Sequence, residues 1–146
     1  IGEAEKAGQI VDWLSSKYWS SGMGSFHNVG HLFNTDISGG LPAVIIEMLA
    51  YSQPGKISIL PALPKKWLQG KIEGVLLRGQ VELKELAWEN KKLRLVIRSA
   101  KQQTLEFSFP SSIKSFEGVN IKRASPNRLQ IAAPAGEDIA FNVLLH

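Results

Sequence analysis

The segment from Leu41 to Ala50 is apolar on nearly every face and constrains the fold more than any other part of the chain. A helix that is apolar all round has to be packed on all sides. Pro42 suits the first turn of such a helix, where its missing N–H has no partner, and Pro54-Gly55 supply a stop. The sequence therefore predicts a buried helix that needs other elements around it. The apolar residues of this segment are Leu41, Ala43, Val44, Ile45, Ile46, Met48, Leu49 and Ala50.

A carboxylate precedes this helix. Asp36 stands in a short polar stretch that ends in Ser38-Gly39-Gly40, which we expect to be a loop. The N-terminal end of a helix has free N–H groups and partial positive charge, which favour an ionised carboxylate or a bound anion. Asp36 is therefore a candidate for a carboxylate held in a defined place. A simple helix-capping or turn-forming role is the alternative.

Residues 3 to 19 read as an amphipathic helix. Apolar side chains recur there at steps of three and four, which places them on one face. The segment from Ser20 to Gly30 has three glycines and no periodicity and is predicted to be a loop. The apolar face of the first helix consists of Ala7, Ile10, Val11, Leu14 and Tyr18.

After Gly55 the pattern changes to short strand-like runs separated by turn residues. The segment Glu89-Asn90-Lys91-Lys92 is typical of a hairpin turn between two of them. Strands at this spacing predict an antiparallel β-sandwich, with the boundary between residues 1–54 and 55–146 near Pro54-Gly55. The predicted strands are Ile57–Leu60, Ile72–Leu77, Val81–Trp88, Leu93–Ser99, Thr104–Phe109, Val119–Lys122, Leu129–Ala132 and Ile139–Leu144.

Composition excludes several classes of function. With 146 residues, 44% of them hydrophobic, the chain can build a core, and without cysteine it has neither disulfides nor cysteine metal sites. The net charge of +4 is mild and its lysines and arginines are scattered, which does not favour a nucleic-acid partner. No apolar run is long enough for a membrane span. The chain opens on Ile1 instead of Met, so we expect a fragment or a processed product.

Several motifs together carry a family resemblance. Asp36 before the apolar helix, Leu60-Pro61-Ala62-Leu63-Pro64 followed by Trp67, and Arg78-Gly79 after the next strand run occur in this order. This order resembles the C-terminal part of glycoside hydrolase family 95, over most of residues 3 to 98. The resemblance implies an α+β chain: the last two helices of an (α/α)6 barrel in residues 1–54, then the C-terminal β-sandwich domain.

The resemblance also implies a reaction. The family comprises α-L-fucosidases and some α-L-galactosidases, which hydrolyse with inversion. A glutamic acid protonates the leaving oxygen, and asparagines backed by an aspartate position the attacking water. Alignment on Phe33 and Asp36 makes Asp36 that aspartate. The acid and the asparagines would lie upstream, in the barrel of the same chain, so we expect this chain alone to be inactive.

The same resemblance places substrate contacts around Asp36. His31, Asn34 and Phe33 are candidates for binding the sugar, although His31 is one position out of register with the family histidine and could equally pack in the loop. Trp19, Phe26 and Phe33 offer an apolar platform for a sugar, or a plug between the barrel end and the β domain. The expected partner is an oligosaccharide or glycoconjugate glycan, and the resemblance favours a periplasmic or extracellular location.

Two other chemistries are not favoured, and no cofactor is expected. His27 and His31 lie four residues apart, but glycines around them make a shared helix face improbable and no third metal ligand is near. Ser25, His27 and Asp36 supply the residue types of a nucleophilic triad without the Gly-x-Ser-x-Gly elbow. The alternatives for the whole chain are a structural or carbohydrate-binding β-sandwich, or an (α/α)6 glycosidase for another sugar such as L-galactose.

The remaining distinctive residues are predicted to be structural. Trp13, Trp67 and Trp88 suit a core or a domain interface. The two prolines of residues 60–64 would fix an extended crossing from the helices to the sandwich.

Overall fold

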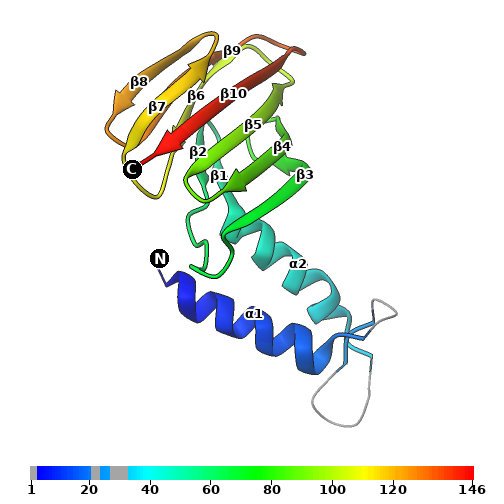
Figure 1. The fold of residues 1–146 in the computed structure, drawn as a ribbon. Helices are drawn as coiled ribbons and strands as arrows, with labels where there is room; N and C mark the ends of the chain where they lie inside the picture. The colour runs from blue at the N-terminus through cyan, green and yellow to red at the C-terminus, as the bar shows by residue number, and fades with distance from the viewer. Residues whose placement is uncertain (1–2, 21–23, 27–32) are drawn as a thin grey trace.

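The computed structural model describes residues 3–20, 24–26 and 33–146. Two helices lie below a pair of β-sheets, as Figure 1 shows. Helix α1 spans Ala4–Tyr18 and α2 spans Thr35–Leu49. The described residues thus form an α+β chain with two helices, and the (α/α)6 barrel stays a prediction.

The two sheets have five strands each. The first has the order β1-β2-β6-β9-β8 and the second has the order β3-β4-β5-β10-β7. Every pairing within the sheets is antiparallel except that of β2 with β6, which is parallel and departs from the predicted all-antiparallel sandwich. In chain order the strands are β1 Ala50–Gln53, β2 Lys56–Ile59, β3 Gln69–Leu77, β4 Val81–Glu89, β5 Lys92–Ser99, β6 Gln103–Ser108, β7 Ile113–Gly118, β8 Ile121–Ser125, β9 Arg128–Ala133 and β10 Asp138–Leu145.

The core lies between the facing sheets. Side chains alternate between buried and exposed along β5, β9 and β10, which is the pattern of strands with one face against a partner sheet. The rings of Phe107 and Phe141 meet edge to face, with centroids 5.5 Å apart. The sandwich is therefore a packed domain with its own core. Fully buried members from both sheets include Leu83, Leu95, Ile97, Leu105, Leu129 and Ile131.

Each of the eight predicted strands overlaps an observed strand, although Val119 and Asn120 of the sixth lie in the bend before β8, and two strands were missed. Strand β1 follows α2 without a break, so its alternation is hidden behind the apolar helix, and β7 contains only two large apolar residues. Because β1 pairs with β2, the first sheet begins at Ala50, ahead of the predicted boundary at Pro54-Gly55. The predicted hairpin turn is confirmed: Glu89 pairs with Lys92, and Asn90 takes the positive φ of 54° that such turns require.

Helix α2 begins earlier than predicted. Ser38, Gly39 and Gly40 lie inside the helix, and Pro42 stands in its interior instead of its first turn. The helix is also not packed on all sides. Leu41 is buried, but Val44, less than one turn later, is 50% exposed. The prediction of a helix buried all round was therefore wrong for the described chain.

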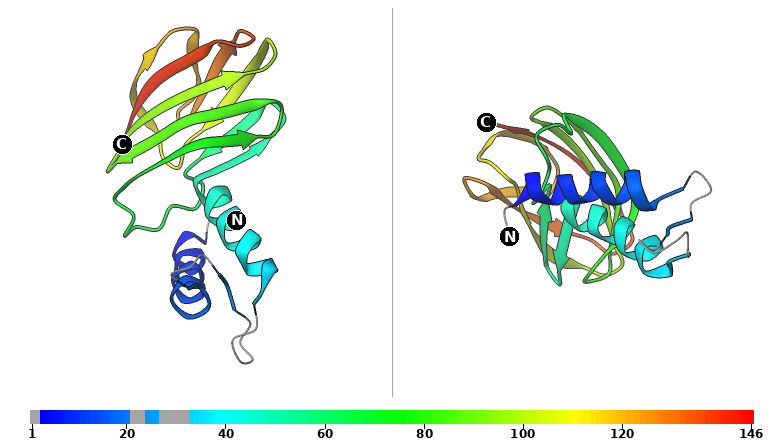
Figure 2. Two further views of the ribbon diagram at one scale, coloured as in Figure 1. Left: turned by 90° about the vertical axis from the view of Figure 1, so that its right-hand side faces the viewer. Right: turned by 90° about the horizontal axis from the view of Figure 1, so that it is seen from below.

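A second, smaller core joins the helices to each other and to the sandwich. Its buried residues are Val11, Leu41 and Met48. Ile45 and Trp67 pack against both this cluster and the core of the sandwich. Figure 2 shows α1 and α2 side by side beneath the sheets, in the position that this shared packing requires. The helices and the sandwich therefore form one continuous packed body.

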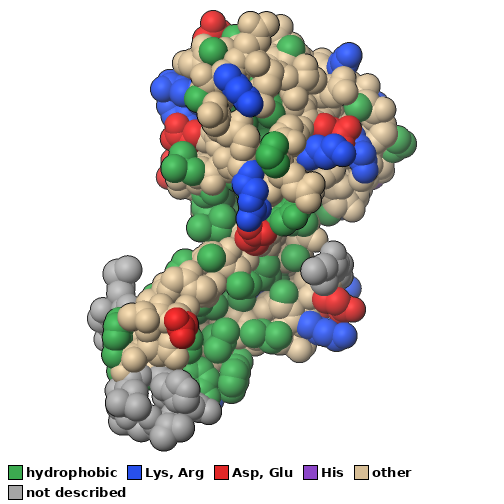
Figure 3. All heavy atoms as spheres, turned by 180° about the vertical axis from the view of Figure 1, so that it is seen from behind, with side chains coloured by type: hydrophobic (Ala, Val, Ile, Leu, Met, Phe, Trp, Pro, Cys, Tyr) green, Lys and Arg blue, Asp and Glu red, His purple; other side chains and the backbone are tan. Residues whose placement is uncertain are grey.

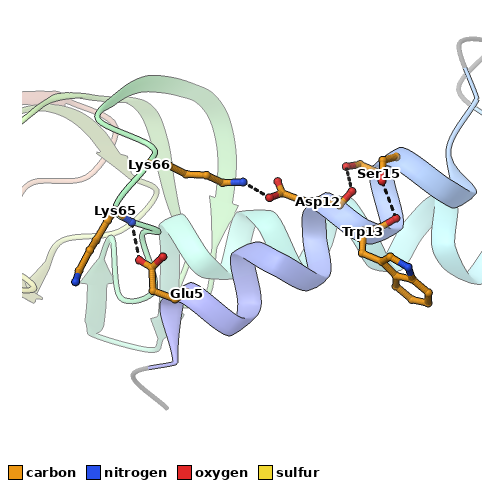
Figure 4. A network of polar contacts seen from close by, with 7 residues as sticks. Glu5, Asp12, Trp13, Ser15, Lys65 and Lys66 are labelled. Atoms are coloured by element: carbon orange, nitrogen blue, oxygen red, sulfur yellow. Dashed lines mark hydrogen bonds and ion pairs between the residues drawn. The ribbon is translucent and has the colours of Figure 1, made fainter.

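The loop between β2 and β3 holds α1 against the sandwich, as Figure 4 shows in part. Glu5 Oε1 accepts a hydrogen bond from Lys65 N (2.8 Å), and Lys66 forms an ion pair with Asp12. Trp88 Nε1 donates to Trp67 O (2.9 Å), which fixes the far end of the loop on β4. The loop leaves the sandwich, contacts α1 and returns to the sandwich, so it acts as a structural clamp on α1. A structural role was predicted for this segment, but the predicted single crossing from the helices to the sandwich is not what the structure shows.

No helix in the described part of the chain has the length and apolar character needed to cross a membrane.

Candidate catalytic site

Asp36 lies in the first turn of α2, at the end of the helix that points away from the sandwich (Figure 1). Asn34 caps this helix: its Oδ1 accepts hydrogen bonds from Asp36 N (2.9 Å) and Ile37 N (3.3 Å). An N-cap of this kind satisfies two of the otherwise unpaired N–H groups of the first turn. The backbone of Asp36 is therefore held in place, while its side chain is exposed.

Ser25 and Ser38 hydrogen-bond to the backbone of the capping residue Asn34. Ser25 is 0% exposed, and its Oγ lies 2.7 Å from Ser38 Oγ. Ser25 Oγ donates to the backbone oxygen of Asn34, and Ser38 Oγ reaches the same oxygen at 3.2 Å. Asn34 N in turn donates to Ser25 O (2.8 Å). The short strand pairing around residue 25 is thus tied to the first turn of α2 through side chains and backbone together.

The other sequence-predicted residues fall into different places. Phe33 is 65% exposed and pairs through a β-bridge with Phe26. Trp19 is partly buried and packs against the core between the helices. His27 and His31 lie outside the described residues. Ser25 is buried with its hydroxyl engaged, so it does not have the access of a nucleophile.

Ion pairs explain the charged clusters on the sandwich. The hydrogen bond from Arg98, and after it the one from Lys84, holds the pKa of Asp138 below its usual value; the bond to Asp138 also raises the pKa of Arg98. These groups are exposed and mutually satisfied, which is the pattern of surface pairs and not of a catalytic centre. Within the described residues no three His, Asp or Glu side chains gather to hold a metal ion.

An apolar groove of about 910 Å³ runs between the helices and the edge of the first sheet. Figure 3 shows hydrophobic side chains gathered on this face, over the helices and below the sandwich. Ile10 of α1 and Val44 of α2 are 57% and 50% exposed, and Tyr51 of β1 lines the same groove. Trp13 is also 52% exposed, with its ring edge-on to Tyr18, so of its two predicted places it does not occupy the core of the described chain. Exposed apolar surface gathered in a groove is typical of interaction surfaces and ligand-binding sites.

The model of the family described as glycoside hydrolase family 95, C-terminal domain, matches residues 51–143. The chain belongs to glycoside hydrolase family 95. The match confirms the resemblance that the sequence motifs suggested, and it spans the sandwich from β1 to β10. A search of curated proteins found no match.

Arg78-Gly79, one of the motifs that carry the family 95 resemblance, lies within the matched residues. Arg78 follows β3 and binds two parts of the chain: its Nη1 donates to Ser52 O (2.8 Å) and to Glu47 Oε1 of α2 (3.3 Å). Gly79, at φ 88°, lies so close to the backbone of Pro54 that a Cβ would approach its Cα to 3.2 Å. Arg78-Gly79 therefore fastens the end of α2 and β1 to the second sheet, which is a structural role within the family 95 domain.

Sequence reasoning missed the part that Ser25 and Ser38 play and the true start of α2. Asn34 was read as a sugar contact, although asparagine is among the strongest N-cap residues and Asp36 two positions later fits a first helical turn. That signal was present. The pairing of Ser25 with Ser38 depends on how the intervening chain returns, and no local pattern records it.

Proposed function

We propose that this chain is the C-terminal part of an inverting α-L-fucosidase that removes terminal α-linked L-fucose from oligosaccharides, with Asp36 supporting the catalytic water. Membership of family 95 makes the parent protein a glycoside hydrolase with a carbohydrate substrate. The observation that carries the finer proposal is the placement of Asp36. Its carboxylate is exposed at the free end of α2 on a capped and braced backbone, so that groups from elsewhere in the enzyme can reach it.

The chemistry requires partners that this chain does not supply. An oxocarbenium-like transition state needs an acid on the leaving-group side and a polarised water on the opposite face. In the proposed arrangement, upstream asparagines hold the water, and Asp36 accepts their amide hydrogens to fix their orientation. The general acid, a glutamic acid, also comes from the upstream catalytic domain.

The apolar groove supports a larger enzyme of this kind. Ile10, Val44 and Tyr51 leave apolar surface in water that the remaining helices of the catalytic domain would cover. In that assembly α2 is surrounded as its apolar sequence demands. The free end of α2 would then open into the centre of the catalytic domain.

Residues around Asp36 would contact the sugar. Phe33 presents an exposed ring to which the apolar face of L-fucose can stack, and the side-chain amide of Asn34 and the imidazole of His31 are candidates for hydrogen bonds to hydroxyls. L-galactose differs from L-fucose by one exocyclic hydroxyl, so an α-L-galactosidase is the nearest alternative within the same mechanism.

Substitution of Asp36 in the complete enzyme tests the proposal. Asp36→Asn and Asp36→Ala should each lower kcat roughly 10²–10⁴-fold, the range for losing acid–base assistance. The melting temperature should change little, because the backbone cap by Asn34 does not need the carboxylate. Glu137→Ala, an exposed acid on the sandwich, is the control and should leave kcat unchanged. An effect on melting temperature with full activity would instead make Asp36 a simple helix-stabilising residue.

The proposal that the general acid lies in the upstream domain can be tested separately. The 146-residue chain should release no aglycone from an aryl α-L-fucoside, because the general acid is missing. Measurable turnover by this chain would contradict an upstream acid.

Carbohydrate binding by the sandwich is the second candidate function. A depression of about 570 Å³ on the second sheet exposes Arg94, Glu117 and Asn142, which could hydrogen-bond to a glycan. Among the described residues that line it, however, the rings of Trp88 and Phe116 are buried or partly buried, so stacking on a sugar face is weak. Isothermal titration of the chain with fucosylated oligosaccharides should show no binding at this surface, and Asn142→Ala should change nothing. Saturable heat that Asn142→Ala removes would favour a binding module.

A further inference from the structure

The hydroxyl of Ser25 is the most completely buried polar group near Asp36, and the proposed function does not use it. Ser25 is 0% exposed and comes before Asp36 in the chain, on the bridge that pairs residue 25 with Trp19. A buried hydroxyl is costly unless it is hydrogen-bonded. Here its bonds go to Asn34 O and to Ser38 Oγ, the two groups on either side of Asp36 in sequence.

The hydroxyl groups of Ser25 and Ser38 both lie within hydrogen-bond distance of Asn34 O, and we call this arrangement the serine brace. Ser25 Oγ donates to Asn34 O, and Ser38 Oγ, one helical turn after Asn34, can donate to the same oxygen or to Ser25 Oγ. Together with the Asn34 Oδ1 cap, they fix the backbone before, at and after Asp36. The turn is thus held by a segment outside the helix as well as by the helix itself.

The sequence of the first turns makes such a brace useful. Gly39 and Gly40 follow directly, and a Cβ at either would meet no atom within 4 Å, so these two positions add no side-chain packing to the first turns of α2. Each glycine costs about 1 kcal/mol of helix stability relative to alanine. A carboxylate on a loose turn would sample several positions, whereas misplacement of a catalytic group by about 1 Å can cost about 10²-fold in rate.

We propose that Ser25 and Ser38 are positioning residues that hold the first turn of α2 and thereby fix the carboxylate of Asp36 for catalysis. The inference rests on the proposed role of Asp36 and adds the means by which that role is maintained. Neither serine needs to touch substrate. Their effect is on the geometry of Asp36 and not on sugar binding.

The test compares Ser38→Ala with Ser38→Thr in the complete enzyme. Loss of the hydroxyl should lower kcat about tenfold or more with KM changed less than about twofold, since positioning acts on the transition state. Ser38→Thr keeps the hydroxyl and should restore most of the activity. Ser15→Ala, which removes an exposed hydroxyl bonded to Asp12 O within α1, is the matched control and should change neither constant.

A second measurement reads the brace itself. In the 146-residue chain, amide hydrogen exchange at Asp36 and Ile37 should be faster in Ser38→Ala than in wild type, while exchange at the buried strand β5 stays unchanged. A general loss of stability would instead speed exchange in both places. Ser25→Ala should act in the same direction as Ser38→Ala, provided that β5 remains protected.

The outcomes separate this inference from the proposed function. If Asp36→Asn is inactive while Ser38→Ala keeps full kcat or unchanged amide exchange, the positioning role is overturned and the role of Asp36 stands. If Asp36→Asn is fully active, the proposed function fails first and the positioning role falls with it. Reduced kcat in Ser38→Ala with local exchange confined to the first turn supports both.

Discussion

Asn34 shows how far a single residue could be interpreted from sequence. Its position beside Asp36 predicts a contact with the sugar, but in the structure its Oδ1 is bound to the backbone of the helix that follows. The same residue type serves as a helix cap and as a sugar ligand, and only the dihedral angles of the chain decide which. The cap uses only the Oδ1 atom of Asn34. Its side-chain amide nitrogen is therefore the group that we propose for a hydrogen bond to the sugar.

Gly70 is a residue whose importance only the packing reveals. It faces Trp88 across the β3–β4 pair, and a Cβ at this position would lie 2.3 Å from Trp88 Cζ2. The indole cannot easily retreat, because its Nε1 is bound to Trp67 O. Gly70→Ala should therefore destabilise the 146-residue chain by about 1–3 kcal/mol through overpacking, measured by urea denaturation.

The control for Gly70→Ala removes the part of the Trp88 ring that a Cβ at residue 70 would meet. In a Trp88→Phe background the outer part of the indole is absent, and adding the methyl group at residue 70 should cost much less than in wild type. Equal costs in the two backgrounds would show that the ring is not what excludes a side chain at Gly70.

At the scale of elements, apolar runs and alternation predicted eight of the ten strands, and the amphipathic period predicted α1 almost to its ends. What could not be predicted depended on context. Strand β7 has too few apolar residues to stand out and is specified by its pairing with β10. Helix α2 extends through Ser38-Gly39-Gly40 because the Asn34 cap and the serine brace hold a turn that local propensity disfavours.

Gly8 and Gly39 allow the effect of helix propensity on stability to be distinguished from the effect of side-chain packing. Gly8 of α1 lies under the clamp, and a Cβ there would meet Pro64 Cγ at 2.7 Å, whereas a Cβ on Gly39 of α2 meets nothing within 4 Å. Gly39→Ala should raise the free energy of unfolding by about 0.5–1 kcal/mol, and Gly8→Ala should lower it despite the same gain in helix propensity. Thermal unfolding followed by circular dichroism gives both values, and a stabilised Gly8→Ala would mean that Pro64 yields easily.

At the scale of the whole molecule, the motifs of the sequence led to the family and to the sandwich, but not to the way the two parts join. The two prolines of residues 60–64 predict a simple extended connection from the helices to the sandwich. The loop of residues 60–68 instead returns to the sandwich after contacting α1, and it places Trp67 where the helix core and the sandwich core meet. The arrangement arises from long-range contacts that no local pattern encodes, and the length of α2 places Asp36 about 20 Å along the helix axis from the start of β1.

This joint predicts how the molecule unfolds. Because Trp67 packs against both cores, helices and sandwich should unfold together in the wild-type 146-residue chain, with coincident transitions by circular dichroism at 222 nm, which follows the helices, and by the NMR signals of the β5 amides, which follow the sandwich. Trp67→Ala should cost about 2–4 kcal/mol, somewhat below the range for a fully buried tryptophan since this side chain is only partly buried. It should also split the two transitions, with the helices melting first, because they lose much of their contact with the larger core. Leu68→Ala, at the exposed neighbouring side chain, is the matched control and should leave one transition at nearly the wild-type position. A single, cooperative transition in Trp67→Ala would mean that α2 is held by Arg78 and β1 alone, and that the loop adds stability without coupling the two parts.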